Sequence, residues 1–148
     1  MRIYMDVCCL NRPFDDQTQD KVRFETEAIV SMLKCCDADE NWVLVGSDII
    51  ILETLKNRDL VKRQKVLLLH SSAAERVRYN AAIKSRAAEF RKFNVKLFDS
   101  LHLASAEHAN VDVFLSTDVQ LIKSAVHSDI RIRVENPLKY YMEVLNDE

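Results

Sequence analysis

Short apolar runs alternate along this chain with longer segments in which apolar residues recur every three to four positions. The first pattern predicts buried β-strands, and the second predicts helices that bury one face. Because the strand segments are continuously apolar, we expect a parallel sheet covered by helices on both faces. The expected strands are residues 2–5, 42–45, 113–115 and 130–134.

The segments between these strands carry helical spacing and recognisable start signals. Ser47 is expected to cap a helix, and Pro137 to start a terminal helix or tail. Turn-forming residues predict a loop over 11–16. The expected helices are 17–36, 48–57, 60–70, 73–93, 99–109 and 119–126, with 60–70 and 73–93 forming a hairpin. With no internal repeat or linker, we expect residues 1–148 to form a single domain.

The composition is that of a globular protein, since 48% of the 148 residues are hydrophobic and 30% are charged. No apolar run approaches the roughly 20 residues of a membrane span. Asp6 interrupts the N-terminus before a secretory signal can form, so a cytoplasmic protein is expected. The single glycine, Gly46, excludes the Gly-rich phosphate loops of common nucleotide-binding folds.

The four cysteines form two adjacent pairs, Cys8-Cys9 and Cys35-Cys36. Neither pair has the spacing of a zinc site, and adjacent residues do not present two thiolates to one ion. We therefore expect buried, small hydrophobic side chains in a reducing cytosol.

Charge is distributed unevenly. Residues 56–96 carry 12 basic and 3 acidic side chains, whereas the segments on either side are acidic. This basic helical segment is expected to be an insertion or a long crossover on the body of the fold. It indicates either a polyanionic partner or simply a solvated helical face.

Four carboxylates are predicted to lie near one edge of the sheet. Asp6 and Asp118 follow the first and third expected strands, and Glu53 and Asp99 lie on neighbouring helices. Sites in α/β folds form outside the carboxyl ends of the strands. Clustered anions repel one another unless cations or raised pKa values compensate, and oxygen ligands select Mg²⁺ or Mn²⁺.

Each of these acids also has a purely structural interpretation. Asp6 can begin a turn, and Glu53 can mark the polar edge of its helix. Asp99 is favourable near a helix start, and Asp118 can cap the following helix. Their joint placement therefore carries more information than any one of them.

The sequence around the four acids resembles the motifs of PIN-domain nucleases. The stretches are IYMDVCCLN at 3–11, SDIIILE at 47–53, FDSLHLASA at 98–106 and VFLSTD at 113–118. Each motif is weak alone, but the four follow the family's order and spacing over almost the whole chain. One departure is Val7, where the related toxins usually carry a small hydroxyl residue.

The resemblance implies a three-layer α/β sandwich with a central parallel sheet of about five strands. It also implies an endoribonuclease that depends on Mg²⁺ or Mn²⁺, and many small members are VapC-type toxins that pair with an antitoxin protein and form homodimers. Asp6, Asp99 and Asp118 would hold the metal, and Glu53 would bind a second ion or orient the attacking water. Thr117 and Asn11 would support the site, the first through Asp118 and the second through Asp6 or a substrate phosphate.

An anionic pocket repels RNA, so a cationic flank is needed to hold the backbone. The candidate RNA-binding residues are Arg76, Arg78, Lys84, Arg86, Arg91 and Lys92. Tyr79 is available to stack on a base, while the spacing of Phe90 and Phe93 is more typical of core residues. His102 lies one turn from Asp99 and is expected to support or pack rather than react.

Two other functions compete with the nuclease. The same fold without catalysis would be a regulatory module that binds RNA or protein. A phosphotransfer receiver or aspartyl-phosphate phosphatase also uses an acidic α/β pocket. The phosphatases, however, need an acid where this chain has Cys8, and the receivers need paired acids before Asp6.

Overall fold

The computed structural model describes residues 1–147 and contains one sheet of five strands. The strand order is β3-β2-β1-β4-β5, and every neighbouring pair is parallel. This confirms the predicted α/β class and its parallel sheet. The strands are β1 (Arg2–Met5), β2 (Val43–Ser47), β3 (Glu75–Val77), β4 (Val113–Leu115) and β5 (Arg133–Glu135).

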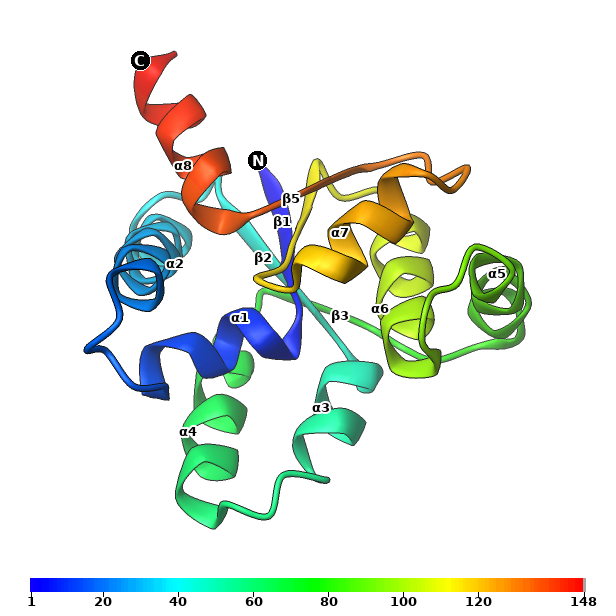
Figure 1. Cartoon of the computed structure of the whole chain (residues 1–148), viewed down its shortest axis with the longest axis horizontal. Coiled ribbons are helices and arrows are strands. Elements are labelled where there is room, and N and C mark those ends of the chain that lie inside the picture. The colour runs from blue at the N-terminus through cyan, green and yellow to red at the C-terminus, as the bar shows by residue number, and fades with distance from the viewer. Residues whose placement is uncertain (148) are drawn as a thin grey trace.

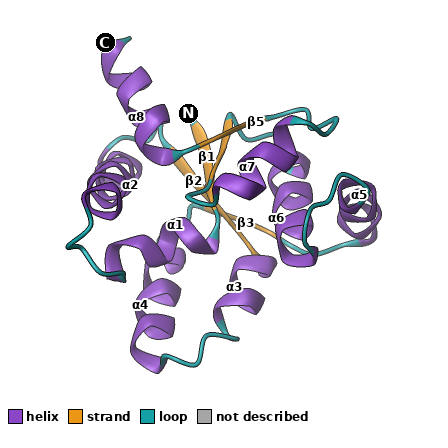
Figure 2. Cartoon of the chain, in the orientation of Figure 1, coloured by secondary structure: helices purple, strands orange, loops and turns teal. Residues whose placement is uncertain are grey.

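Helices cover both faces of the sheet (Figures 1 and 2). In Figure 1, α2 and α8 lie on one side of the strands, α6 and α7 lie on the other, and α5 packs outside α6. The helices are α1 (Val7–Asn11), α2 (Asp20–Ala38), α3 (Asp48–Thr54), α4 (Leu60–Ser71), α5 (Ala81–Arg91), α6 (Leu97–His108), α7 (Val119–Val126) and α8 (Pro137–Asn146). A 3-10 turn, Arg12–Phe14, follows α1.

The centre of the core is formed by β1 and β4. Ile3, Tyr4 and Met5 are fully buried, as are Phe114 and Leu115 on the neighbouring strand. The Tyr4 and Phe114 rings stack with centroids 5.2 Å apart. Because both faces of these strands are covered, every residue after Arg2 on β1 and every residue on β4 is apolar or aromatic, which is the continuous pattern seen in the sequence.

The prediction of one helix over 73–93 is wrong in its first part, which forms β3. The helix itself is the shorter α5. Glu75 and Arg76 are exposed on this edge strand. The strand exists because it pairs with β2, with Gly46 opposite Arg76. Such pairing is a tertiary effect that leaves no apolar run in the local sequence.

The first loop also differs from expectation. The expected loop over 11–16 is instead the end of α1 and the 3-10 turn, and α1 begins at Val7 because Asp6 caps it. Of the four cysteines, only Cys9 is buried; Cys8 is exposed, and the other two are half-buried. None of the helices within residues 1–147 has the length and apolar character that a membrane span requires.

Candidate active site

The strand order of the sheet reverses between β1 and β4, so a site is expected at the carboxyl ends of these two strands. From β1 the chain proceeds to β2 and β3 on one side, whereas β4 and β5 extend the sheet on the other side. Ligands bind where the strand order reverses in this way. Asp6 directly follows β1, and its backbone N–H donates to the Leu115 carbonyl at the end of β4 (3.2 Å). Asp118 lies three residues beyond Leu115.

Asp6 is almost completely buried, with 2% of its surface exposed. Its Oδ1 accepts a hydrogen bond from the Cys9 N–H (3.0 Å), and Ser116 also bonds to its carboxyl group. Burial raises the pKa of Asp6 to about 6, and the charge of Asp99 acts in the same direction. The two hydrogen bonds and His102 oppose this shift without cancelling it.

Asp99 and Asp118 both line a small pocket of about 30 Å³. Asp99 lies in the first turn of α6, and Asp118 caps α7 by accepting from the backbone N–H groups of Gln120 and Leu121. Desolvation raises the pKa of Asp99, and the charges of Glu53 and Asp118 raise it further. The pocket is large enough for one or two water molecules.

Glu53 approaches the same region from α3. Its Oε1 lies 3.0 Å from Nε2 of the buried His102, one turn beyond Asp99 on α6. On the other side of that ring, Nδ1 lies 2.7 Å from the Tyr4 hydroxyl, which is 2.6 Å from the Ser47 hydroxyl. Burial keeps the pKa of Tyr4 well above its ordinary value.

The charges of all four predicted acids raise the pKa of one neighbouring group, the Cys8 thiol. Although Cys8 is exposed as a residue, protein atoms around its sulfur raise the pKa of the thiol. The charges of the four acids add to this effect. The structure therefore brings Asp6, Glu53, Asp99 and Asp118 within electrostatic reach of one another.

A hard divalent cation fits the chemistry of this cluster. The four carboxylates provide only oxygen donors, and burial together with the charge of Asp99 raises the pKa of Asp6. Among residues 1–147, however, no three His, Cys, Asp or Glu side chains are already close enough to chelate an ion. Binding therefore requires side-chain rotation or bridging waters, which Mg²⁺ usually retains.

Sequence reasoning missed the role of Ser116. Its Oγ accepts from the Asp118 N–H (3.0 Å) and also bonds to Asp6, so it links two of the acids. The expected supporting residue, Thr117, is buried beside it and lines a neighbouring pocket together with Asn11. The signal for Ser116 is its place between β4 and Asp118, where a hydroxyl can bond two residues ahead.

Two further residues near α1 bear on the site. Asn11 Oδ1 is buried and has no hydrogen-bond partner in the part of the chain that the structure describes. Val7, at the position where the related toxins usually carry a hydroxyl, is buried in the core. It therefore offers no oxygen to the carboxylate cluster.

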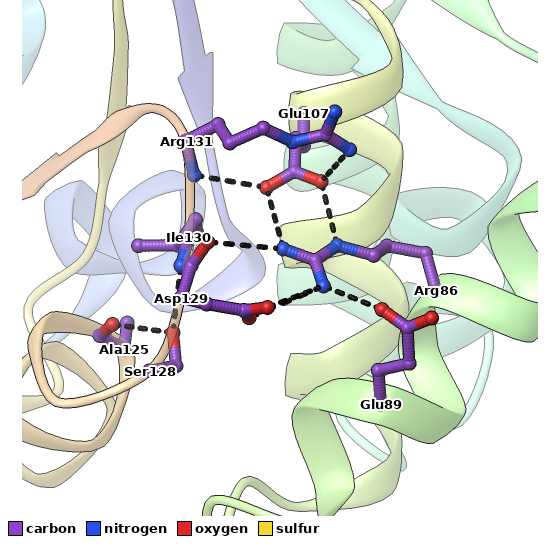
Figure 3. Close-up of polar contacts among 8 residues, drawn as sticks. All are labelled: Arg86, Glu89, Glu107, Ala125, Ser128, Asp129, Ile130 and Arg131. Atoms are coloured by element: carbon purple, nitrogen blue, oxygen red, sulfur yellow. Dashed lines mark hydrogen bonds and ion pairs between the residues drawn. The ribbon is translucent and has the colours of Figure 1, made fainter.

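Arg86, one of the predicted RNA-binding residues, is already held by acidic side chains (Figure 3). Its Nε lies 2.6 Å from Glu107 Oε1, and its Nη1 lies 2.6 Å from Glu89 Oε2. Asp129 completes its contacts through its carboxylate (3.2 Å) and its backbone carbonyl (3.2 Å), and Arg131 also binds Glu107 (2.8 Å). Arg86 therefore ties α5 to α6 and to the loop before β5, so we leave it out of the RNA-contacting set.

The other predicted cations are more available. Arg78 follows β3 at the same edge of the sheet as the acids, and with His70 and Arg76 it lines a pocket of about 530 Å³. Arg76 is half-exposed and paired with Asp48 (3.1 Å). Arg91, Lys92 and, near the start of α5, Lys84 are exposed.

Lys96 was missed as a candidate cation. It immediately precedes α6, and its charge lowers the pKa of Asp99, against the stronger effect of desolvation. Its place at the end of the basic segment, three residues before Asp99, was the available signal.

Two comparisons with known proteins bear on this site. The PIN domain family matches residues 13–126, a stretch that includes Glu53, Asp99 and Asp118 and begins after Asp6. The fold is similar to the crystal structure of VapBC2 from Rickettsia felis bound to a DNA fragment from their promoter, with a TM-score of 0.59 and 16% sequence identity. That similarity covers 92% of this chain and 98% of the other. No curated protein matches the sequence significantly.

Proposed function

Because this chain belongs to the PIN domain family, we propose that it is an endoribonuclease that requires Mg²⁺ or Mn²⁺. The observation that carries the proposal is that the charges of Asp6, Glu53, Asp99 and Asp118 all raise the pKa of one thiol, Cys8, next to the carboxyl end of β1. An anionic pocket of this kind is costly to maintain without a bound cation. The phosphatase and receiver alternatives receive no comparable support.

The residues of the site would have different roles in phosphodiester hydrolysis. Asp6, Asp99 and Asp118 would hold the ion, which when bound neutralises the phosphoryl oxygens and makes water more nucleophilic. Glu53, which is hydrogen-bonded to His102 on α6, would bind a second ion or orient the attacking water. Ser116 would fix Asp6 relative to Asp118 through its two hydrogen bonds.

The cationic residues would hold the RNA backbone beside the acids. Arg78 follows β3 and Arg76 lies in the middle of it, and Arg91, Lys92 and Lys84 are exposed on or beside α5. Such contacts bind phosphates without reading the sequence, so binding should weaken steeply with salt. The alternative of a catalytically silent module retains this surface and differs only in the cleavage step.

The similarity to the VapBC2 structure supports a narrower proposal, that this protein is the toxin of a toxin–antitoxin pair and forms a homodimer. A small DNA-binding protein encoded upstream would be the expected antitoxin. When the two are produced together, they should form a complex that has lost the nuclease activity. A complex that cleaves RNA as fast as the free protein would contradict this role, and light scattering would give the oligomeric state.

The decisive experiment is RNA cleavage by the purified protein with Mn²⁺, with Mg²⁺ and with EDTA. Cleavage should require the ion and should fall at least about 100-fold in Asp6→Asn and Asp99→Asn, because each loses an anionic ligand. Asp37→Asn, an exposed acid on α2, is the matched control and should retain full activity. Folded variants that keep metal-dependent activity would contradict the proposal and indicate a contaminating nuclease.

A further inference from the structure

A chain of buried hydrogen bonds stands behind Glu53. It runs from Glu53 Oε1 to His102 Nε2 (3.0 Å), from Nδ1 to the Tyr4 hydroxyl (2.7 Å) and on to the Ser47 hydroxyl (2.6 Å). Ser47 Oγ in turn accepts from the Ile50 N–H (3.1 Å). His102, Tyr4 and Ser47 each have no exposed surface.

The chemistry of these groups determines which atom donates and which accepts in each of these hydrogen bonds. A carboxylate only accepts, so His102 Nε2 carries the proton that it donates to Glu53. In a neutral ring, Nδ1 is then the acceptor for the Tyr4 hydroxyl. Since Ser47 Oγ already accepts from Ile50, its own proton points to Tyr4, and every donor and acceptor in the chain is satisfied.

This series of hydrogen bonds also joins the elements that carry the acids. Tyr4 lies on β1 two residues before Asp6, and His102 lies on α6 one turn after Asp99. Ser47 caps the N-terminus of α3, and Glu53 lies near the other end of that seven-residue helix. The hydrogen bonds thus fix the Glu53 carboxylate against both α6 and β1.

We propose that His102 is a positioning residue that holds the Glu53 carboxylate toward Asp99, with Tyr4 and Ser47 as its buried anchor. This inference rests on the proposed nuclease function. Glu53 is the member of the site that needs such support, because its longer side chain is about one-third exposed (31%). The competing interpretation is a buried histidine whose hydrogen bonds only stabilise the fold.

The two interpretations differ in a double-mutant cycle between His102→Leu and Glu53→Gln. Mn²⁺ affinity is measured by the electron paramagnetic resonance of the free ion, and kcat and KM are measured on RNA. Partners that orient metal ligands typically change affinity about 10- to 100-fold, which is the loss expected for His102→Leu. We expect kcat to fall similarly while KM for RNA changes less than about twofold.

In the Glu53→Gln background, His102→Leu should cause no further loss of Mn²⁺ affinity or kcat, because the group that it positions is already altered. Equal losses in both backgrounds would overturn the proposal. Tyr4→Phe removes one oxygen and should reduce Mn²⁺ affinity and kcat less than His102→Leu does. This reduction should also disappear in the Glu53→Gln background. His102→Gln, which retains a donor for Glu53, should recover most of the affinity.

Ser105→Ala is the matched control, since it removes a buried hydroxyl that bonds to the Leu101 carbonyl on the same helix (2.8 Å). It should leave Mn²⁺ affinity and kcat unchanged, and a loss as large as that of His102→Leu would overturn the proposal. If His102→Leu does not fold, Tyr4→Phe and His102→Gln complete the cycle. If the wild type binds Mn²⁺ but cleaves no RNA, the nuclease function fails while the cycle on Mn²⁺ affinity still decides the positioning role.

Discussion

At the scale of single residues, Asp6 links the geometry of the site to the stability of the protein. Its pKa is about 6 in the folded protein, against an ordinary value of 3.8. The folded state therefore holds this proton more tightly than the unfolded chain. The resulting stability is fully present below pH of about 4 and is lost as pH rises through about 6, a change of about 3 kcal/mol.

Asp6→Asn should remove this pH dependence from the metal-free protein. Asparagine retains an acceptor for the Cys9 N–H but never becomes charged, so the variant should exceed the wild type in stability at pH 8. Urea unfolding in EDTA between pH 4 and pH 8 measures the difference. A wild-type protein that gains stability relative to Asp6→Asn as pH rises would contradict the account.

A second residue-scale prediction concerns Gly46 on β2. A Cβ at this position would lie 2.3 Å from Nε2 of the buried His70 ring, which accepts a hydrogen bond from the Ser47 N–H (3.1 Å). Gly46→Ala should therefore destabilise the protein by about 1 to 3 kcal/mol through overpacking. In urea unfolding the effect should shrink when His70→Ala is also present, and equal effects in both backgrounds would refute this cause.

At the scale of elements, Arg86 and Arg78 should separate stability from RNA binding. Arg86 joins α5 to α6 through Glu107, whose side chain is only 4% exposed. Arg86→Met leaves that carboxylate with Arg131 alone and should cost about 2 kcal/mol, less than the loss of an isolated buried pair. Urea unfolding measures this cost, and an unchanged stability would contradict the structural role of Arg86.

Arg78→Ser should have the opposite profile, because Arg78 is exposed after β3. It should leave stability unchanged and reduce the dependence of log binding affinity on log salt concentration by about one. RNA binding titrated over a range of salt concentrations, with EDTA present to prevent cleavage, measures this slope. A slope equal to that of the wild type would remove Arg78 from the RNA-contacting set.

The elements could be predicted from the sequence where their signals are local. β1 and β4 are continuous apolar runs, and the cap at Ser47 begins α3 as expected. β3 could not be predicted, because its exposed residues form a strand only by pairing with β2. α1 has a local signal, the Asp6 cap before four apolar residues, which the turn chemistry around Pro13 obscured.

At the scale of the whole molecule, the common edge of the acids follows from the parallel sheet, because all its strands end on the same side. The sequence therefore predicts that Asp6 and Asp118, which follow strands, lie near one edge, and the placement of Glu53 and Asp99 on neighbouring helices remains part of the same prediction. The bond from Ser116 to Asp6 and the chain from Glu53 to Ser47 depend on side-chain contacts between distant segments. No spacing in the sequence encodes those contacts.

Binding of the ion should stabilise the whole protein by mass action. At a concentration of 100 times its Kd, Mn²⁺ should add about 2.7 kcal/mol to the free energy of unfolding. At a fixed Mn²⁺ concentration this stabilisation should be larger at pH 8 than at pH 5. Burial raises the pKa of Asp6, so at the lower pH the ion must compete with the proton on its carboxyl group. Thermal unfolding with and without Mn²⁺ measures this, and an equal gain in Asp99→Asn would place the ion elsewhere.

The most direct test of the central claim is anomalous diffraction from a crystal soaked in Mn²⁺. The account predicts a manganese peak at the carboxyl ends of β1 and β4, bonded directly or through water to Asp6, Asp99 and Asp118. The peak should be absent from crystals of Asp99→Asn soaked in the same way. A well-occupied manganese site away from these carboxylates, or no site in the wild type, would contradict the claim.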